Sequence, residues 1–403
     1  MNILYIAYSC APNSGSENRI GWSVPLEMAK RGNNVSVITK EEHRQAISNY
    51  METNRVANLR FYYADIPQIY KRMFKGFLYS ARLNIWHGKA MPMAERICKE
   101  NDIQVIHQIT PIEIRAIGDY GRIAGIKFVA GSLGGGEFTP SGLRSYAKGH
   151  RAIETVRALM NAWFRFYYKA TGRLKRCDYI LYANKETKEY LGVNGLVETE
   201  IAVDTISETC HQYKDGHGKT VFLMAGRMIY RKGVPLLFDA LETLPENYDY
   251  EVRIVGDGPD MAKLQKRYRQ SVKLQKHVTF TGRVPFLQMK DEYAKADVFV
   301  MPSIRETGGS VMLEAMSNGI PLIAVNRFGS GMLLNDDLGW TFDGKVKQDF
   351  IESLATAMAE CIKHPEEVKR KGRNMLEVAK KYTWEVKATH FMKIYEMLLN
   401  GKK

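Results

Sequence analysis

Residues 2–8, NILYIAY, form an almost unbroken apolar run, which is typical of a strand buried on both faces of a parallel sheet. A polar loop follows. Residues 19–32 then favour a helix, and NVSVITK at 34–40 favours a second strand. This order predicts a βαβ unit at the start of a doubly wound α/β domain. Further strands are expected at 103–109, 127–132 and 178–184.

The same alternation begins again at residues 219–227, KTVFLMAGR, after a polar stretch at 208–219 that is expected to be a linker. A chain of 403 residues is long enough for two or three domains. We therefore expect two α/β domains, over residues 1–207 and 208–383. The remaining residues, 384–403, are predicted to form an amphipathic helix.

The formal net charge is +14, and most of it lies in the first 200 residues. Such an excess predicts an anionic partner: nucleic acid, an acidic membrane surface or phosphates. Residues 70–89 and 144–176 interleave basic and large aromatic side chains, as helices at membrane interfaces do. Binding to nucleic acid, or a core-packed helix with a solvated basic face, are the alternatives.

The five cysteines are widely spaced and form no CxxC pair, so neither a disulfide framework nor a zinc site is predicted. The N-terminus lacks the basic region of a signal peptide, and no apolar stretch is long enough to span a membrane. We expect a protein of the reducing cytosol.

The stretch SIRETGGSVMLEAMSNGIPLIAV, residues 303–325, predicts a strand-to-helix turn that carries Glu306, Gly308 and Gly309. A helix N-terminus presents unpaired N–H groups, and glycines let a ligand approach them closely. Glu314 lies one turn into the predicted helix, on the same face as Ser310. The two carboxylates could bind hydroxyls of one extended ligand. The alternative is an ordinary helix with solvated glutamates.

A second motif, AGRMIYRKG at 225–233, places Arg227 and Lys232 after the end of a predicted strand. Two cations at the carboxyl end of a parallel strand suit a diphosphate. The alternative is a basic surface loop.

Three weaker features lie in the first half of the chain. The loop after the first strand contains Gly15 and Ser16 and could bind phosphate, or could be a tight turn. The loop GSLGGGEFTP contains Gly135, Gly136 and Glu137; Glu137 could touch a polar ligand, or the segment could be a mobile surface loop. His107 ends a buried strand and is either a packed residue or a catalytic one.

Taken together, the first-strand loop, GRMIYRKG, IVGDGP, FTGRVP and RETGGSVMLEAMSNGIPLI resemble the retaining glycosyltransferases of family 4. The loops with GSE and GGGE resemble those of a bacterial subgroup. The resemblance implies the GT-B fold: two Rossmann-like doubly wound α/β domains that face each other across a cleft. The first would bind the acceptor and the second the nucleotide-sugar donor, and the helix over 384–403 is expected to cross back to the first.

The resemblance also implies roles for individual residues. Arg227 and Lys232 would bind the donor diphosphate, Glu306 the sugar hydroxyls and Glu314 the ribose. Gly308, Gly309 and Ser310 would offer backbone N–H groups, and Gly15 and Ser16 would close on the phosphate. We take Arg227, Lys232, Glu306 and His107 as the catalytic candidates. The acceptor-side candidates are Gly135, Gly136 and Glu137.

We expect transfer of a hexose from a nucleoside diphosphate sugar, most simply a UDP-sugar, with retention and without a metal or other cofactor. The expected acceptor is a sugar or a polyprenyl-linked sugar used in cell-surface polysaccharide synthesis. The expected location is the inner face of the plasma membrane, with an anionic membrane surface and no nucleic acid as partner. A non-catalytic two-lobed sugar- or nucleotide-binding protein and a GT-B sugar-nucleotide epimerase are the alternative functions.

Overall fold

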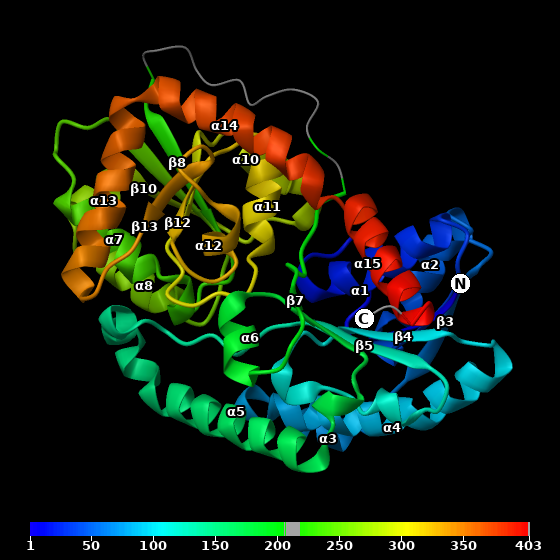
Figure 1. Ribbon diagram of the computed structural model, residues 1–403. Coiled ribbons are helices and arrows are strands. Elements are labelled where there is room, and N and C mark those ends of the chain that lie inside the picture. Colours follow the sequence, from blue (N-terminus) through cyan, green and yellow to red (C-terminus); the bar gives the residue numbers. More distant parts are fainter. Residues whose placement is uncertain (205, 207–217, 402–403) are drawn as a thin grey trace. The chain divides into compact units, whose positions relative to one another are not determined.

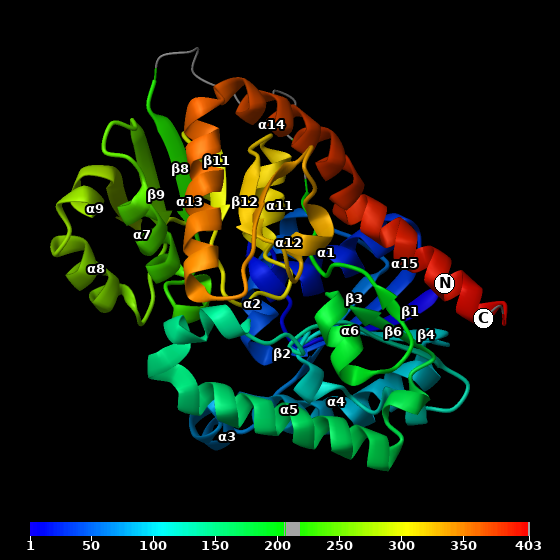
Figure 2. The ribbon, with the colours of Figure 1, turned by 60° about the vertical axis from the view of Figure 1, so that its left-hand side comes forward.

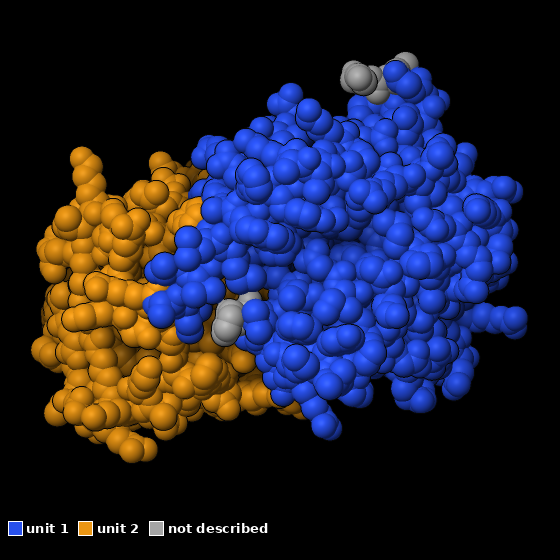
Figure 3. All heavy atoms as spheres, turned by 90° about the horizontal axis from the view of Figure 1, so that it is seen from below, with its two compact units in different colours: residues 1–136, 152–202, 384–403 blue, residues 137–151, 203–383 orange. Residues whose placement is uncertain are grey.

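The computed structural model describes residues 1–204, 206 and 218–401, and the chain divides into two compact units (Figure 1, Figure 3). Unit 1 comprises Met1–Gly136, Ala152–Ala202 and Trp384–Lys403, and unit 2 comprises Glu137–Arg151 and Val203–Thr383. The predicted linker at 208–219 lies almost wholly outside the described residues. Each unit is an α/β structure built on a parallel sheet, as the repeated strand–helix pattern predicted.

In the described part of the chain, the sheet of unit 1 has seven parallel strands in the order β3-β2-β1-β4-β5-β6-β7. Its central strands are buried along almost their whole length because helices cover both faces. The strands are β1 (Asn2–Ala7), β2 (Asn34–Lys40), β3 (Leu59–Ala64), β4 (Val105–Thr110), β5 (Lys127–Leu133), β6 (Tyr179–Tyr182) and β7 (Leu196–Val197).

Helices α1, α2 and α15 lie on one face of this sheet, and α3, α4 and α5 lie on the other (Figure 1). The helices of unit 1 are α1 (Ser16–Lys30), α2 (Arg44–Thr53), α3 (Gln68–Met73), α4 (Tyr79–Glu100), α5 (Arg151–Thr171), α6 (Lys185–Leu191) and α15 (Trp384–Leu399).

The C-terminal helix α15 belongs to unit 1 because its apolar side completes that core. Trp384, Phe391 and Tyr395 are buried among residues of α1 and the sheet. Lys387, also buried, reaches Glu198 (3.2 Å) and the backbone of the same loop. A helix so far along the chain is thus held by both apolar packing and a buried cation with its own acceptors.

In unit 2, the described residues form a sheet of six parallel strands in the order β10-β9-β8-β11-β12-β13. The strands are β8 (Thr220–Ala225), β9 (Tyr250–Val255), β10 (Val278–Gly282), β11 (Val298–Met301), β12 (Leu322–Val325) and β13 (Gly339–Phe342). The helices are α7 (Val234–Thr243), α8 (Met261–Arg269), α9 (Val272–His277), α10 (Met289–Tyr293), α11 (Ser310–Ser317), α12 (Ser330–Leu333), α13 (Lys347–Lys363) and α14 (Pro365–Ala379).

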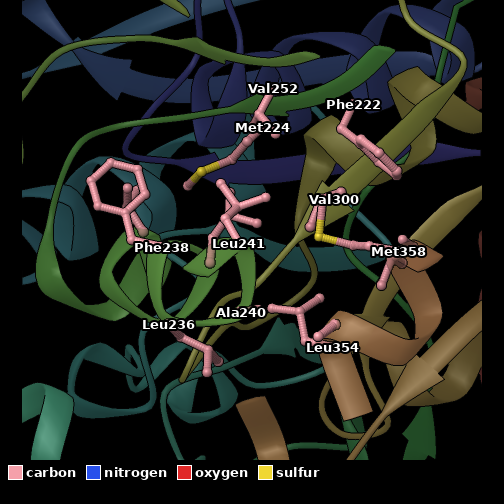
Figure 4. Packing of buried hydrophobic residues seen from close by; sticks show 14 of the residues in the cluster. Phe222, Met224, Leu236, Phe238, Ala240, Leu241, Val252, Val300, Leu354 and Met358 are labelled. Atoms are coloured by element: carbon pink, nitrogen blue, oxygen red, sulfur yellow. The ribbon is translucent and has the colours of Figure 1, made fainter. Parts of the chain in front are cut away.

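The main core of unit 2 lies where α7 and α13 pack on the sheet (Figure 4). Phe222 and Val300, from the neighbouring strands β8 and β11, belong to this cluster together with Leu241 on α7 and Met358 on α13 (labelled in Figure 4). These side chains are fully buried, so they anchor β8 and β11, the strands from which the two candidate loops extend.

Residues 137–151 differ from the sequence-based expectation, which placed them in the first domain. The structure groups them with unit 2, where they include the 3-10 helix η5 (Ser141–His150). The cause is apolar burial: Leu143 and Ala147 lie in the core cluster of unit 2, with Phe350. No helix in the described part of the chain is both long and apolar enough to cross a bilayer.

Candidate functional site

The two predicted donor-binding loops of unit 2 come together at the point where its strand order reverses. Residues 226–233 follow β8, residues 302–309 follow β11, and these two strands are neighbours. Ligands of doubly wound sheets bind at this place. Gly233 has a φ of +72°, and a Cβ on it would overlap the carbonyl oxygen of Pro302. A glycine is therefore required for the two loops to touch.

Lys232 and Glu306 form an ion pair between these loops, through Nζ and Oε2. Their side chains are only 14% and 10% exposed. Burial alone raises the pKa of the Glu306 carboxyl. The charges of Lys232 and Arg231, with a hydrogen bond from the Thr307 N–H (3.3 Å), outweigh burial and hold the pKa below its usual value. The carboxylate is thus ionised at neutral pH, and each partner orients the other.

The N-terminus of α11 opens beside this pair. Gly309 is its N-cap residue, with a φ of +79°, and no side chain among the described residues caps the helix. A Cβ on Gly309 would lie 3.1 Å from the Met301 sulfur. The first N–H groups of α11 are therefore left without a side-chain acceptor, as an anion-binding helix end requires.

Glu314 lies one turn into α11 and is oriented by a residue that the sequence did not single out. The hydroxyl of Tyr293, the last residue of α10, donates to Oε2 of Glu314 (2.9 Å). Tyr293 is 1% exposed, so its position is fixed by the core. The sequence carries no periodic signal for this contact, because α10 is a short helix in a segment of mixed polarity.

Arg227 is exposed and follows Gly226, whose φ is +151°. Its guanidinium makes no hydrogen bond or ion pair with any residue that the structure describes. Of the two predicted phosphate ligands, Lys232 is thus already paired with Glu306, whereas Arg227 is available to a ligand.

In unit 1, Gly15 and Ser16 lie at the start of α1, at the carboxyl edge of the sheet beside the reversal between β1 and β4. Their role toward a donor phosphate stays a prediction. The adjacent Glu17 was not singled out from the sequence. Burial, and then the nearby Glu113, raise the pKa of its carboxyl to about 7.

His107 is a packed residue, and its catalytic candidacy is corrected by the structure. It has no exposed surface, and each ring nitrogen already has a partner: the Tyr395 hydroxyl (2.6 Å) at Nδ1 and the Gly131 carbonyl (2.7 Å) at Nε2. Burial lowers its pKa to about 4. A neutral, enclosed imidazole with both nitrogens engaged does not reach substrate.

The three acceptor-side candidates are consecutive in the chain, but their hydrogen-bond partners lie in different units. The carbonyl of Gly135 accepts from Arg157 (2.6 Å) and Asn161 (2.9 Å), and the N–H of Gly136 donates to Thr187 (3.2 Å), all within unit 1. Glu137 belongs to unit 2. Its Oε1 accepts a hydrogen bond from the Thr307 hydroxyl (3.1 Å). This contact could not be predicted from the sequence, because its partners are 170 residues apart in the chain.

The two basic aromatic segments divide into packed and exposed parts. In residues 70–89, Trp86 is buried, and Lys71 is paired with Asp65 (2.8 Å), so much of that segment is core. In α5, by contrast, Leu159, Trp163 and Phe166 are 65%, 57% and 69% exposed. Large apolar side chains therefore gather on the solvent-facing side of α5.

Some of the basic residues that follow α5 are neutralised internally. Arg173 and Arg176 approach the carboxylate of Asp119, at 3.8 Å and 2.8 Å.

Among the described residues, no cluster of three or more His, Cys, Asp or Glu side chains could hold a metal ion. That the reaction proceeds without a metal ion stays a prediction.

Residues 208–375 match the family model described as "Glycosyl transferases group 1". Relatives include the sulfoquinovosyl transferase SQD2 of Arabidopsis thaliana, 31% identical over 42% of this chain and 32% of that protein. Another is a GDP-mannose-dependent alpha-(1-6)-phosphatidylinositol monomannoside mannosyltransferase of Mycobacterium tuberculosis, 33% identical over 39% and 41%. The matched segment spans less than half the length of these relatives.

Solved structures extend the likeness to nearly the whole chain. The lipopolysaccharide outer core galactosyltransferase WaaB in its apo form has a TM-score of 0.66 at 16% identity, over 97% of this chain and 98% of that one. The Anabaena protein Alr3699/HepE in complex with UDP has a TM-score of 0.61 at 16% identity, over 99% of both chains. Likeness at this identity establishes the fold, and the GT-B prediction is confirmed.

Proposed function

We propose that this protein is a retaining glycosyltransferase that moves a sugar from a nucleoside diphosphate sugar to a sugar or lipid-linked acceptor. The observation that carries the proposal is the Lys232–Glu306 pair, held between the loops after β8 and β11 and beside the open N-terminus of α11. This arrangement offers cationic, anionic and backbone N–H groups to one ligand at the place where doubly wound sheets bind nucleotides.

The diphosphate would be bound by Arg227, Lys232 and the first N–H groups of α11. These groups stabilise the charge that develops when the bond between the anomeric carbon and the phosphate oxygen breaks. In a same-face mechanism, the acceptor oxygen bonds to the anomeric carbon on the side that the diphosphate leaves. The acceptor proton then passes to the leaving diphosphate, so no protein base is required.

The two glutamates would have separate tasks. Glu306 is at the loop end beside Lys232, where a sugar attached to the bound diphosphate would place its hydroxyls. Glu314, oriented by Tyr293, would accept hydrogen bonds from the ribose hydroxyls. An ionised carboxylate suits both tasks, because it accepts hydrogen bonds without a competing proton.

For the donor base we favour uracil, on the likeness of the fold to a protein solved with UDP. Guanine is the alternative, because a relative in the donor half is named as GDP-mannose-dependent. The acceptor we favour is a polyprenyl-linked or other lipid-linked sugar for cell-surface polysaccharide, reached at the inner face of the plasma membrane. The exposed apolar face of α5, with basic residues near it, supports contact with an anionic membrane surface.

The proposal is tested by a thermal-shift screen of UDP, UDP-glucose, GDP and GDP-mannose, followed by an assay for release of the nucleoside diphosphate. We expect the nucleotides of one base, either uracil or guanine, to raise the Tm of the protein. The sugar nucleotide of that base should be consumed slowly by transfer of its sugar to water. Tight binding without release, with membrane lipids supplied as acceptor, would instead favour a binding protein. Conversion of the sugar nucleotide to an epimer would favour an epimerase.

A further inference from the structure

A segment that the chain inserts into unit 2 from the first half of the sequence contacts both donor loops. We call residues 137–151 the strap. The structure groups it with unit 2, while the residues on either side, Gly136 and Ala152, belong to unit 1. Its first and last parts contact different loops of the candidate site, and its middle is fixed in the core.

The middle of the strap is firmly anchored. Leu143 is fully buried and Ala147 is 4% exposed, both in the core cluster of unit 2. Gly142 lies so close to residues 345–350 that a Cβ on it would come within 2.8 Å of the Lys345 carbonyl oxygen. The Tyr146 hydroxyl donates to Asp239 on α7 (2.5 Å). These contacts hold η5 in one position, so the groups at its two ends are held as well.

One end of the strap meets the loop after β11. The buried carboxylate of Glu137 accepts from the hydroxyl of Thr307 (3.1 Å), and Thr307 donates its backbone N–H to Glu306 (3.3 Å). Glu306 in turn pairs with Lys232. A hydrogen-bonded series therefore runs from the strap to the charged pair.

The other end meets the loop after β8. The ring of His150 stacks on the ring of Tyr230, with centroids 4.1 Å apart and planes 12° from parallel. Tyr230 begins the turn η7 (Tyr230–Lys232) that ends at Lys232, and its hydroxyl also accepts from Arg305 (3.2 Å), the neighbour of Glu306. The stack thus covers the turn that sets the position of the phosphate-binding lysine.

We propose that the strap is a positioning element of the donor site, in which Glu137 sets the turn that carries Glu306 and His150 sets the turn that carries Lys232. The proposal rests on the proposed function. It changes the assignment of Glu137, which the sequence had suggested for the acceptor side. Neither residue reacts with substrate; each acts through the loop residue that it holds.

The two ends predict different kinetic effects. Glu137→Ala, or Thr307→Val, should lower kcat for hydrolysis of the sugar donor about five- to tenfold, the effect of one well-oriented hydrogen bond, and leave the Kd for UDP within twofold. The losses in the double variant should be less than additive, because both changes remove the hydrogen bond between Glu137 and Thr307. Glu137→Gln keeps an acceptor oxygen and should recover most of the rate.

His150→Ala should instead weaken UDP binding several-fold, and His150→Phe, which can still stack, should restore it. Tyr146→Phe is the matched control, since it removes a single hydrogen bond at the middle of the strap, while the buried Leu143 and Ala147 still hold η5 in the core. It should lower Tm slightly and leave both the UDP Kd and donor kcat unchanged.

The measurements are calorimetric titration with UDP and donor turnover with UDP-glucose, or with GDP and GDP-mannose if the wild type prefers them. Effects of Glu137→Ala and His150→Ala confined to Tm, like those of Tyr146→Phe, would overturn the proposal. Additive losses in the Glu137 and Thr307 double variant would also overturn it. A wild type that binds none of the four nucleotides would contradict the proposed function itself, which separates the two failures.

Discussion

At the scale of single residues, the site depends on charged side chains and on which of them are already paired. Lys232 and Glu306 were predicted for different parts of a donor, and the structure joins them in one ion pair. A ligand phosphate must therefore share Lys232 with Glu306, whereas Arg227 is exposed and uncommitted to any described residue.

Arg227→Ala and Lys232→Ala should each weaken binding of the nucleoside diphosphate roughly 10- to 100-fold, as expected for loss of a charge-assisted hydrogen bond. Only Lys232→Ala should also lower Tm, because it leaves the buried Glu306 carboxylate without its cation. Calorimetry and thermal unfolding of both variants measure this. Unchanged affinity in both would refute the phosphate assignment.

Glu306→Gln and Glu314→Ala should have different effects, the first on turnover of the sugar donor and the second on binding of the nucleotide. The first should reduce turnover of the sugar donor and leave the Kd for the bare nucleoside diphosphate nearly intact, because the amide keeps the shape but not the charge. The second should weaken the bare nucleotide, since a ribose acceptor oriented by Tyr293 is lost. Equal effects of the two changes on donor and nucleotide would contradict this division.

His107 predicts a pH effect on stability and none on the reaction. Burial lowers its pKa to about 4, so folding disfavours its protonated form, and stability is lost as pH falls from about 6.5 toward 4. His107→Gln should make the denaturant midpoint less sensitive to pH in this window, while the buried His43 and His87 keep some of the slope. The pH–rate profile between pH 5 and 8 should keep its shape. A lost limb of that profile would restore the catalytic interpretation.

At the scale of elements, strands could be predicted from the sequence more accurately than side-chain contacts. The runs at 2–8 and 34–40 lie on β1 and β2 because buried parallel strands are continuously apolar. The edge strand β3 was missed, since its half-exposed pattern lacks that signal. In residues 144–176, the mixture of basic and aromatic residues was evident. Which aromatics pack inward, as Tyr168 does, depends on tertiary contacts that the sequence does not state.

Helix α5 should insert its outward face into an anionic membrane surface. Leu159, Trp163 and Phe166 recur at helical spacing and are all more than half exposed, and Lys169 lies exposed on the same helix. Replacing Leu159, Trp163 and Phe166 by Ser should abolish sedimentation with vesicles of anionic phospholipid.

Two variants serve as controls. The double variant Lys169→Gln with Lys175→Gln should weaken vesicle binding at low salt only. The second control is Arg176→Gln. The last residue is engaged by Asp119 (2.8 Å), so its loss should matter less for vesicle binding. If the three apolar substitutions leave vesicle binding unchanged, α5 is instead a helix whose outer face is solvated.

At the scale of the whole molecule, the two α/β units and the positions of the two candidate loops after β8 and β11 were predictable, because the strand–helix pattern restarts and each motif follows a strand. The strap was not. Leu143 and Ala147 are too few apolar residues to indicate which core they join, and Glu137 finds Thr307 only in the folded chain. The burial of His107 likewise depends on Tyr395, 288 residues away.

The central claim, a nucleotide-sugar site at the strand-order reversal of unit 2, is tested most directly by hydrogen–deuterium exchange with and without the nucleotide that raises Tm most. We predict that protection appears in residues 226–233 and 302–316, the loops after β8 and β11 with the first turns of α11, and that Arg227→Ala reduces it. Protection that leaves both loops unchanged while another part of the chain is protected would contradict the account.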